Sequence, residues 1–202
     1  MNCTFSRMNY LAHAYLSFEH PQIMVGNMIS DFVKGRDKFG YTADVQKGIA
    51  LHRAIDAYTD DHAATRAARE IFRPAYRLYS GPVMDIIYDF FLANDPLQFD
   101  NGLDAFVSGV YKTLGDHTAM LPPRFIHVFG YMTAENWLRN YQFEWGIERS
   151  LAGLVRRSSF LVESRTAFGL FQTHQDHLHR CYSDFIGDVK QFAKQKFHEL
   201  LA

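Results

Sequence analysis

The most apolar helix that the sequence predicts reads Gly81-Pro82-Val83-Met84-Asp85-Ile86-Ile87-Tyr88-Asp89-Phe90-Phe91-Leu92. Pro82 suits the first position of a helix, and the pair Asp95-Pro96 ends it. Asp85 and Asp89 interrupt the apolar run four residues apart, so they project from one face. Burying a carboxylate among apolar side chains is costly unless the group is hydrogen-bonded, paired or bound to a metal. The run therefore predicts a buried helix whose two aspartates have a specific purpose.

Helical periodicity extends outward from this run over most of the chain, and alternating strand patterns are scarce. Helices are expected over residues 11–16, 21–34, 42–62, 63–79, 82–94, 103–114, 123–141, 144–157 and 164–201, with a loop at 35–41. Pro74 predicts a kink or break in one of them, and a second break is expected near Gly130. The pattern predicts an all-α, single-domain helical bundle over residues 8–202, with an extra N-terminal segment at 1–7 before a possible native start at Met8.

Composition and charge exclude several classes of protein. The 202 residues include 21 basic and 22 acidic side chains, a net charge of −1, which argues against nucleic-acid binding by bulk positive charge and against a polybasic membrane anchor. No apolar run reaches the roughly 18–20 residues that span a membrane, and the first residues lack a signal-peptide layout, so a cytoplasmic location is expected. Cys3 and Cys181 form no CxxC pair, and neither a disulfide framework nor a thiolate zinc site is expected.

One predicted helix carries a column of possible metal ligands. His52, Asp56 and Asp60 follow one another at intervals of four and project from the same face. Imidazole suits transition metals, and carboxylate suits harder ions such as Mg²⁺ and Mn²⁺, so the column can bind a divalent cation. A solvated helix face explains the same spacing when it is considered alone.

Three further segments offer similar groups in apolar surroundings, and together they favour a common site. The predicted metal ligands are His13, Asp31, His52, Asp56, Asp60, Asp85 and Asp89. For each buried Asp taken singly, a helix cap or a hydrogen-bonded core group is the alternative. A mixed His/Asp site with one or two divalent ions lowers the pKa of bound water and neutralises charge on a phosphoryl oxygen, so phosphoester hydrolysis is the leading reaction class.

Basic side chains offer contacts for a phosphate or an acidic partner, because arginine pairs well with both. The candidates are a stripe on one predicted helix, an adjacent pair on another and two residues beside the proposed ligands: Arg66, Arg69, Arg73 and Arg77; Arg156 and Arg157; Lys34 and Arg53. A solvated face with Glu70 as a local partner also explains the stripe.

Two other groups of residues receive a structural interpretation. His174, His177 and His179 have metal-like spacing but lack apolar shielding, so they are expected on an exposed helix surface. The aromatic side chains of the 125–145 region are most simply explained as core; they are Phe125, Phe129, Tyr131, Trp137, Tyr141, Phe143 and Trp145.

At the proposed His and Asp ligands and the residues around them, the sequence resembles the acyl carrier protein phosphodiesterases. The motifs that carry the resemblance are Met8-Asn9-Tyr10-Leu11-Ala12-His13, Gly26-Asn27, Asp31-Phe32-Val33-Lys34-Gly35, His52-Arg53-Ala54-Ile55-Asp56 with Thr59-Asp60, Asp85-Ile86-Ile87-Tyr88-Asp89-Phe90-Phe91-Leu92, Glu135-Asn136-Trp137-Leu138 and Gly146-Ile147-Glu148-Arg149 with Arg156-Arg157. Each motif is weak alone, but their order is specific and covers nearly the whole chain from residue 8.

The resemblance implies a fold related to the HD-domain phosphohydrolases, Mn²⁺ or a similar ion such as Mg²⁺, and a reaction. That reaction is hydrolysis of the phosphodiester joining 4′-phosphopantetheine to a serine of holo-acyl carrier protein. The family's functional residues fall on Asp31, His52, Asp56 and Asp89 as the catalytic set, with His13 as the N-terminal histidine. The sequence lacks the adjacent His-Asp pair of ordinary HD domains, because His52 and Asp56 are one helical turn apart.

Two alternatives stay open from the sequence. The same site chemistry suits a metal-dependent phosphohydrolase that acts on a nucleotide or another small phosphoester. A non-enzymatic helical module that binds a carrier protein would instead use the His/Asp set structurally. Holo-acyl carrier protein as substrate distinguishes the first alternative, and metal content distinguishes the second.

Overall fold

The computed structural model describes residues 10–202, and every regular element within this range is a helix. The prediction of an all-α chain is therefore confirmed. The predictions for the segment 1–7, for a start at Met8 and for Cys3 lie outside the described residues. Across residues 10–202, no helix combines the length and the apolar character needed to cross a membrane.

The helices follow one another with short connections. The α-helices are α1 (Tyr10–Tyr15), α2 (Pro21–Ile29), α3 (Ala43–Asp61), α4 (Ala63–Tyr76), α5 (Ser80–Ala93), α6 (Leu103–Asp116), α7 (Pro123–Ala134), α8 (Trp137–Asn140), α9 (Glu144–Arg157), α10 (Arg165–Thr173) and α11 (Gln175–Leu201). The 3₁₀ helices are η1 (Ser30–Phe32), η2 (Gly35–Gly40), η3 (Arg77–Tyr79) and η4 (Thr118–Met120). The segment expected as a loop at 35–41 is thus mostly the 3₁₀ helix η2.

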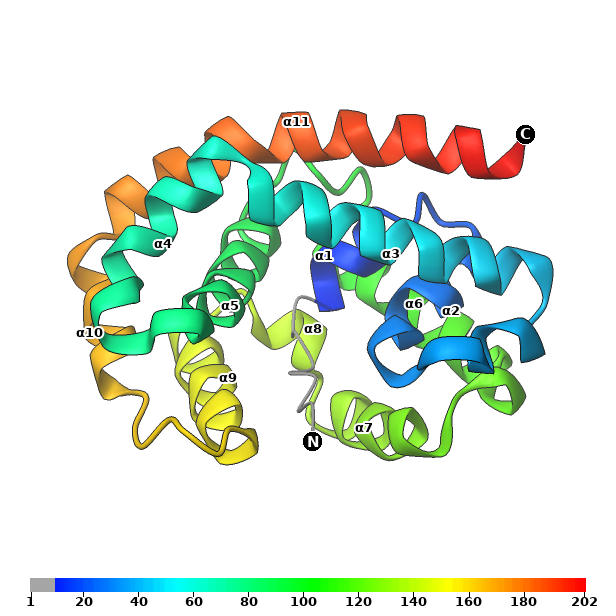
Figure 1. Ribbon diagram of the computed structural model, residues 1–202, viewed down its shortest axis with the longest axis horizontal. Coiled ribbons are helices and arrows are strands. Elements are labelled where there is room, and N and C mark those ends of the chain that lie inside the picture. Colours follow the sequence, from blue (N-terminus) through cyan, green and yellow to red (C-terminus); the bar gives the residue numbers. More distant parts are fainter. Residues whose placement is uncertain (1–9) are drawn as a thin grey trace.

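Helix α5 lies at the centre of the molecule and contacts α1, α4, α9 and α11 (Figure 1). Every side chain from Ser80 to Leu92 is buried, including Asp85 and Asp89. The helix begins at Ser80 rather than at Pro82, which the proline tolerates because amides in the first turn have no partner within the helix. The apolar run of the sequence is therefore the core element around which the other helices pack.

Helices α3 and α4 lie side by side with α11, which crosses one side of the molecule (Figure 1). The single helix expected over 164–201 is wrong, because the chain turns at His174 between α10 and α11. The physical reason is that α10 packs against α4 and α9, whereas α11 follows α3. His177 and His179 are exposed on α11, as expected.

Two predicted helix breaks differ from the structure. The break in the 123–141 region falls at Glu135 and Asn136 rather than at Gly130, because Asn136 takes a left-handed conformation at φ 50° that Asn tolerates well. Gly130 stays inside α7, since one exposed glycine weakens a helix without ending it. Helix α4 continues through Pro74 for two more residues.

Helices α2 and α3 make the most intimate contact in the fold, at Gly26 and Gly48. A Cβ atom at Gly26 would lie 2.1 Å from the carbonyl oxygen of Val45, and one at Gly48 would lie 2.2 Å from that of Ile23. Both positions therefore require glycine so that the two backbones can touch. His52 follows Gly48 by one helical turn, and Asn27 follows Gly26 directly, so this crossing brings them together.

We expect Gly48→Ala to lower the free energy of unfolding by about 2–3 kcal/mol, because the new methyl group meets rigid backbone. Urea unfolding followed by circular dichroism measures the effect. Gly187→Ala is the matched control, since Gly187 lies inside α11 with no neighbouring atom within 4 Å of the added Cβ. That control is expected to be neutral or stabilising by about 0.5–1 kcal/mol. Equal stability of the two variants would contradict the requirement for glycine at this crossing.

Candidate metal centre

His52, on α3, is fixed by a hydrogen bond to the backbone of α2. Its Nδ1 lies 2.8 Å from the carbonyl oxygen of Asn27, and because a carbonyl only accepts, Nδ1 carries the proton. In the neutral imidazole the lone pair is then on Nε2. This atom lies 3.5 Å from Oδ1 of Asp31 and 3.5 Å from Oδ2 of Asp56. The backbone contact thus sets the tautomer that a metal ligand needs.

His13, on α1, completes a compact group with His52 and Asp56. The two imidazole rings stack with their centroids 3.9 Å apart, and Nε2 of His13 lies 3.3 Å from Oδ1 of Asp56. One ligand atom from each of the three side chains lies within 4.8 Å of the other two. No other such group of three or more His, Cys, Asp or Glu side chains occurs in residues 10–202.

The burial of these side chains is graded from the imidazoles to the carboxylates. His13 is 2% exposed and His52 is 4% exposed, whereas the side chains of Asp31 and Asp56 are each 20% exposed. The imidazoles therefore form the floor of the site, and the carboxylates lie toward solvent. Such a floor with an accessible rim suits an ion that must also receive a substrate.

The pKa values of the two histidines shift in opposite directions. Burial and the neighbouring His52 lower the pKa of His13, although Asp56 acts in the opposite direction. Burial also lowers the pKa of His52, but the neighbouring carboxylates of Asp31 and Asp56 outweigh it by stabilising the protonated ring, so the net pKa of His52 is raised. The surroundings thus favour the neutral form of the His13 imidazole and the protonated form of the His52 imidazole.

The geometry of the group fits a divalent cation. The Nε2 atoms of His13 and His52 are buried and have no hydrogen-bond partner within the described residues. Two imidazole nitrogens beside two carboxylates match the ligand types of Mn²⁺, Zn²⁺ and related ions. Such an ion would satisfy both nitrogens at once.

Asn27 is a site residue that the ligand pattern did not single out. Its Nδ2 donates to the carbonyl oxygen of His13 at 2.9 Å and to Oγ of Ser17 at 3.0 Å, and Oγ of Ser17 donates to the same carbonyl at 2.7 Å. Asn27 thereby ties α1 to α2, while its own carbonyl binds His52. The signal in the sequence is that Asn27 carries the single polar side chain in the otherwise apolar stretch from Ile23 to Ile29.

Asp89 holds α1 in place. Its carboxylate accepts hydrogen bonds from the backbone amides of Leu11 at 3.1 Å and Ala12 at 2.9 Å. Burial raises the pKa of Asp89 well above its usual value, and the two amide donors act in the opposite direction. Asp89 therefore binds the N-terminus of the helix that carries His13 and is not a member of the compact His/Asp group.

Asp60 and Asp85 also lie outside that group. The carboxylate of Asp60 pairs with Arg69 of α4, one turn beyond Asp56. Asp85 is buried beside a small cavity that Thr59 and Tyr88 also line. Among the seven predicted ligands, the structure brings together His13, Asp31, His52 and Asp56.

Most arginines of the predicted stripe are paired with acidic side chains. Three members of the α4 stripe pair with nearby acids: Arg66 with Asp61, Arg69 with Asp60 and Arg73 with Glu70. Arg77 has the left-handed φ of 48° and lines a groove with Arg69 and Arg73.

The remaining basic candidates lie on other elements. Arg53 donates to the carbonyl oxygen of Val33 at 3.4 Å, which places it beside the Asp31 segment. Lys34 is exposed just before η2. Arg156 and Arg157 line a pocket between α8 and α9.

The fold and the site define an all-helical protein with a buried histidine floor and an aspartate rim suited to a divalent cation. The model of a family described as acyl carrier protein phosphodiesterase matches residues 8–189, and the chain belongs to this family. No solved structure matches the chain, so the relation to HD-domain folds stays a prediction.

Curated relatives cover almost the whole chain. Acyl carrier protein phosphodiesterases of Klebsiella pneumoniae (strain 342), Enterobacter sp. (strain 638) and Serratia proteamaculans (strain 568) are 34%, 32% and 31% identical over 191 residues. In each case the match covers 94% of this chain and 99% of the relative. The resemblance found in the sequence motifs is thereby confirmed at the level of the family.

We expect Asp89→Ala to lower the free energy of unfolding by about 1–3 kcal/mol, because two buried amides lose their acceptor. The same change is expected to weaken Mn²⁺ binding, since α1 carries His13. Urea unfolding and isothermal titration with Mn²⁺ measure the two effects. Asp89→Asn retains one acceptor oxygen and is expected to keep its metal. Loss of metal from Asp89→Asn at unchanged stability would instead identify Asp89 as a direct ligand.

Proposed function

We propose that this chain is a divalent-metal-dependent phosphodiesterase that removes 4′-phosphopantetheine from holo-acyl carrier protein and leaves the apo-protein. Membership of the family supports the reaction and the substrate. The observation that carries the metal dependence is the convergence of His13, His52 and Asp56 within 4.8 Å. The fixed tautomer of His52 adds a lone pair directed at that group.

His13, His52 and Asp56 would hold the ion, with Asp31 beside them. Imidazole and carboxylate together suit Mn²⁺ better than an all-oxygen ion such as Mg²⁺. When bound, the ion lowers the pKa of water and neutralises charge on the phosphoryl oxygens. Asp60, Asp85 and Asp89 stay predictions as ligands, and the proposal does not depend on them.

The other residues around the site position the substrate and the ligands. Arg53 lies beside the Asp31 segment through its bond to the Val33 carbonyl, where a guanidinium can pair with a phosphate oxygen. Lys34 is close in sequence to Asp31 and exposed, so it is the second candidate for a phosphate contact. The exposed edges of Asp31 and Asp56 leave the site open on the substrate side. A cytoplasmic location stays a prediction from the sequence.

We expect Asp31→Ala to abolish turnover while helical circular dichroism is preserved, because Asp31 lies at the exposed rim rather than in the core. Mass spectrometry of holo-acyl carrier protein incubated with enzyme and Mn²⁺ measures the loss of phosphopantetheine. Asp116→Ala is the matched control, since Asp116 is an exposed aspartate of α6 paired only with Lys112. A fully active, metal-replete Asp31→Ala protein would contradict the role of Asp31.

The same assay separates the alternatives. Turnover of a generic phosphodiester with no loss of phosphopantetheine would favour a small-molecule phosphohydrolase. Protein purified without chelator that holds no ion and gains no activity with Mn²⁺ would support a non-enzymatic module. Either result would overturn the proposed function.

We expect the affinity for Mn²⁺ to fall as the pH decreases, by up to about tenfold per pH unit once His52 binds a proton. The sign follows from the raised pKa of His52: below that pKa the imidazole is protonated, and Nε2 has no lone pair for a metal. Isothermal titration with Mn²⁺ between about pH 6 and 8 measures the change. An affinity that is independent of pH over this range would contradict His52 as a ligand.

A further inference from the structure

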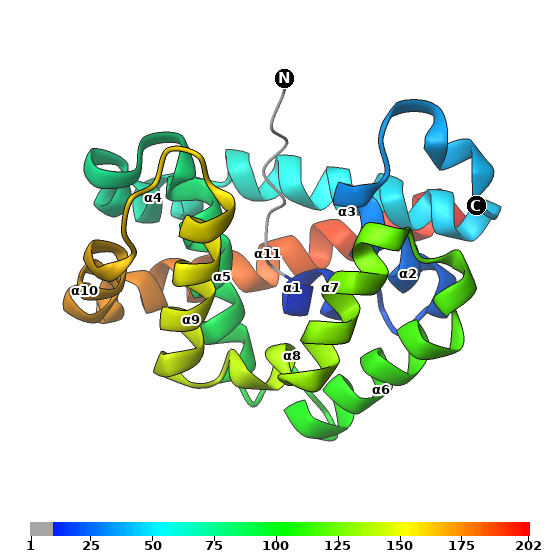
Figure 2. The same cartoon turned by 90° about the horizontal axis from the view of Figure 1, so that it is seen from below.

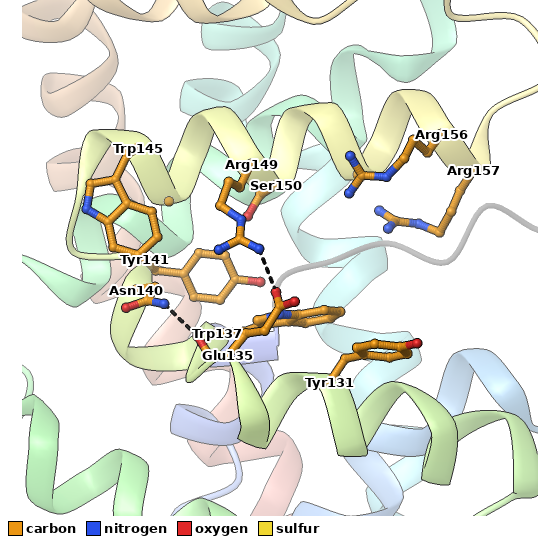
Figure 3. A pocket seen from close by; sticks show the side chains of 12 residues that line it. Tyr131, Glu135, Trp137, Asn140, Tyr141, Trp145, Arg149, Ser150, Arg156 and Arg157 are labelled. Carbon is orange, nitrogen blue, oxygen red and sulfur yellow. Dashed lines mark hydrogen bonds and ion pairs between the residues drawn. The ribbon is translucent and has the colours of Figure 1, made fainter.

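A pocket of about 380 Å³ lies between α8 and α9, with Tyr131 of α7 at its edge (Figure 3). It is separate from the His/Asp group in its lining residues. Most of the side chains that line it are aromatic rings or guanidinium groups. Neither the fold nor the proposed metal centre accounts for this combination.

Trp145 and Arg157 lie at opposite ends of the pocket, with Arg149 and Trp137 between them and Tyr131 on the side of Arg157 (Figure 3). Trp145 and Tyr141 lie at the beginning of α9 and just before it, whereas Arg156 and Arg157 lie at its end (Figure 3). Arg157 follows Trp145 by twelve residues, which corresponds to about 18 Å along a helix axis. The pocket is therefore elongated, with Trp145 at one end and Arg156 and Arg157 at the other, its basic end.

Charge at the basic end is not neutralised within the described residues. Arg149, midway along α9, pairs with Glu135 at 2.9 Å, and Glu135 also accepts from the indole Nε1 of Trp137 at 3.0 Å. By contrast, Arg156 and Arg157 form no ion pair with any acid of residues 10–202. The α4 stripe differs, because three of its arginines already pair with acids.

The pocket and its surroundings contain exposed rings that the sequence assigned to the core. Tyr131 is 51% exposed and Trp145 is 46% exposed, and Phe143 stacks on Trp145 with its centroid 5.5 Å away. These three rings correct the prediction that every aromatic side chain in the region is buried. Tyr141 is buried at the base of the pocket, as expected. Exposed rings beside a concavity present apolar area to a ligand.

Helix α1, which carries His13, lies between α7 and α9 in the view of Figure 2. Both Tyr141 and Arg157, which line the pocket, interact electrostatically with Tyr10, the first residue of α1. His13 follows Tyr10 by three residues on the same helix. Two lining residues of the pocket therefore lie near the helix that supplies one of the proposed metal ligands.

We propose that this pocket binds the pantetheine arm of the substrate, with its phosphate toward Arg156 and Arg157 and its thiol end toward Trp145. The inference rests on the proposed function. Arginine pairs well with a phosphate, and the aromatic rings suit the methyl groups of the chain. Ser150, midway along the pocket, and Asn140, near Trp145, line the pocket and offer hydrogen bonds to the amides of the arm (Figure 3).

The chain provides its own reporter for this site. It contains two tryptophans, Trp137 and Trp145, and both line the pocket. Titration of the full chain with 4′-phosphopantetheine is expected to give a saturable change in tryptophan fluorescence. Pantetheine, which lacks the phosphate, is expected to bind at least tenfold more weakly, and inorganic phosphate is expected to leave the fluorescence unchanged. Equal affinity for the first two ligands would overturn the placement of the phosphate.

The double variant Arg156→Gln/Arg157→Gln tests the basic end. Its affinity for 4′-phosphopantetheine is expected to fall at least tenfold, toward that of pantetheine, and its KM for holo-acyl carrier protein is expected to rise. The matched control is Arg124→Gln/Arg180→Gln, where both arginines are exposed and neither lines the pocket; its affinity for 4′-phosphopantetheine is expected to match the wild type. Weaker binding by the control with no change in the α9 variant would overturn the assignment.

Three further outcomes are decisive. A fluorescence response to apo-acyl carrier protein but none to 4′-phosphopantetheine would assign the pocket to the protein surface of the substrate and overturn the inference. If phosphopantetheine binds with the expected preference while the mass assay shows no conversion of holo-protein, the proposed function fails and the pocket stays assigned. Conversion without any fluorescence response to the arm leaves the function intact and overturns the inference.

Discussion

The backbones of α2 and α3 touch at Gly26 and Gly48, where neither position has room for a Cβ atom. This contact brings the carbonyl of Asn27 to 2.8 Å from Nδ1 of His52. The carbonyl in turn fixes which nitrogen of His52 faces Asp31 and Asp56. A steric constraint between two helices thus becomes a chemical one, because it decides where the lone pair of an imidazole points. The geometry of the site depends on this crossing more than on any single side chain.

Helix α1 is the second element on which the site depends, and it is too short to be stable alone. Asp89 and Asn27 hold it from two sides, the first through the amides of Leu11 and Ala12 and the second through the carbonyl of His13. The desolvation cost of burying Asp89 is offset in part by those two donors. The central helix α5 therefore contributes to the site at a distance, by fixing the helix that carries His13.

Aspartates that look alike in the sequence have different physical roles in the fold. Asp56 faces the histidines, Asp60 faces an arginine one turn later, and Asp89 binds backbone amides. The spacing of four residues is the same in the pairs Asp56/Asp60 and Asp85/Asp89. Spacing determines which side chains share a helix face, but the neighbouring helix determines what that face meets. This is why spacing alone could not rank the predicted ligands.

The sequence by itself determined the all-helical fold, the buried run at α5 and the family, because these depend on local periodicity and on ordered motifs. It also predicted that four helical segments in the first 90 residues offer His or Asp side chains for a common site. Only the tertiary structure decided which of them meet, where the 164–201 segment divides, and that Tyr131, Phe143 and Trp145 line the surface rather than the core. Each of these depends on contacts between residues far apart in the chain, and periodicity records only which face of a helix a residue occupies.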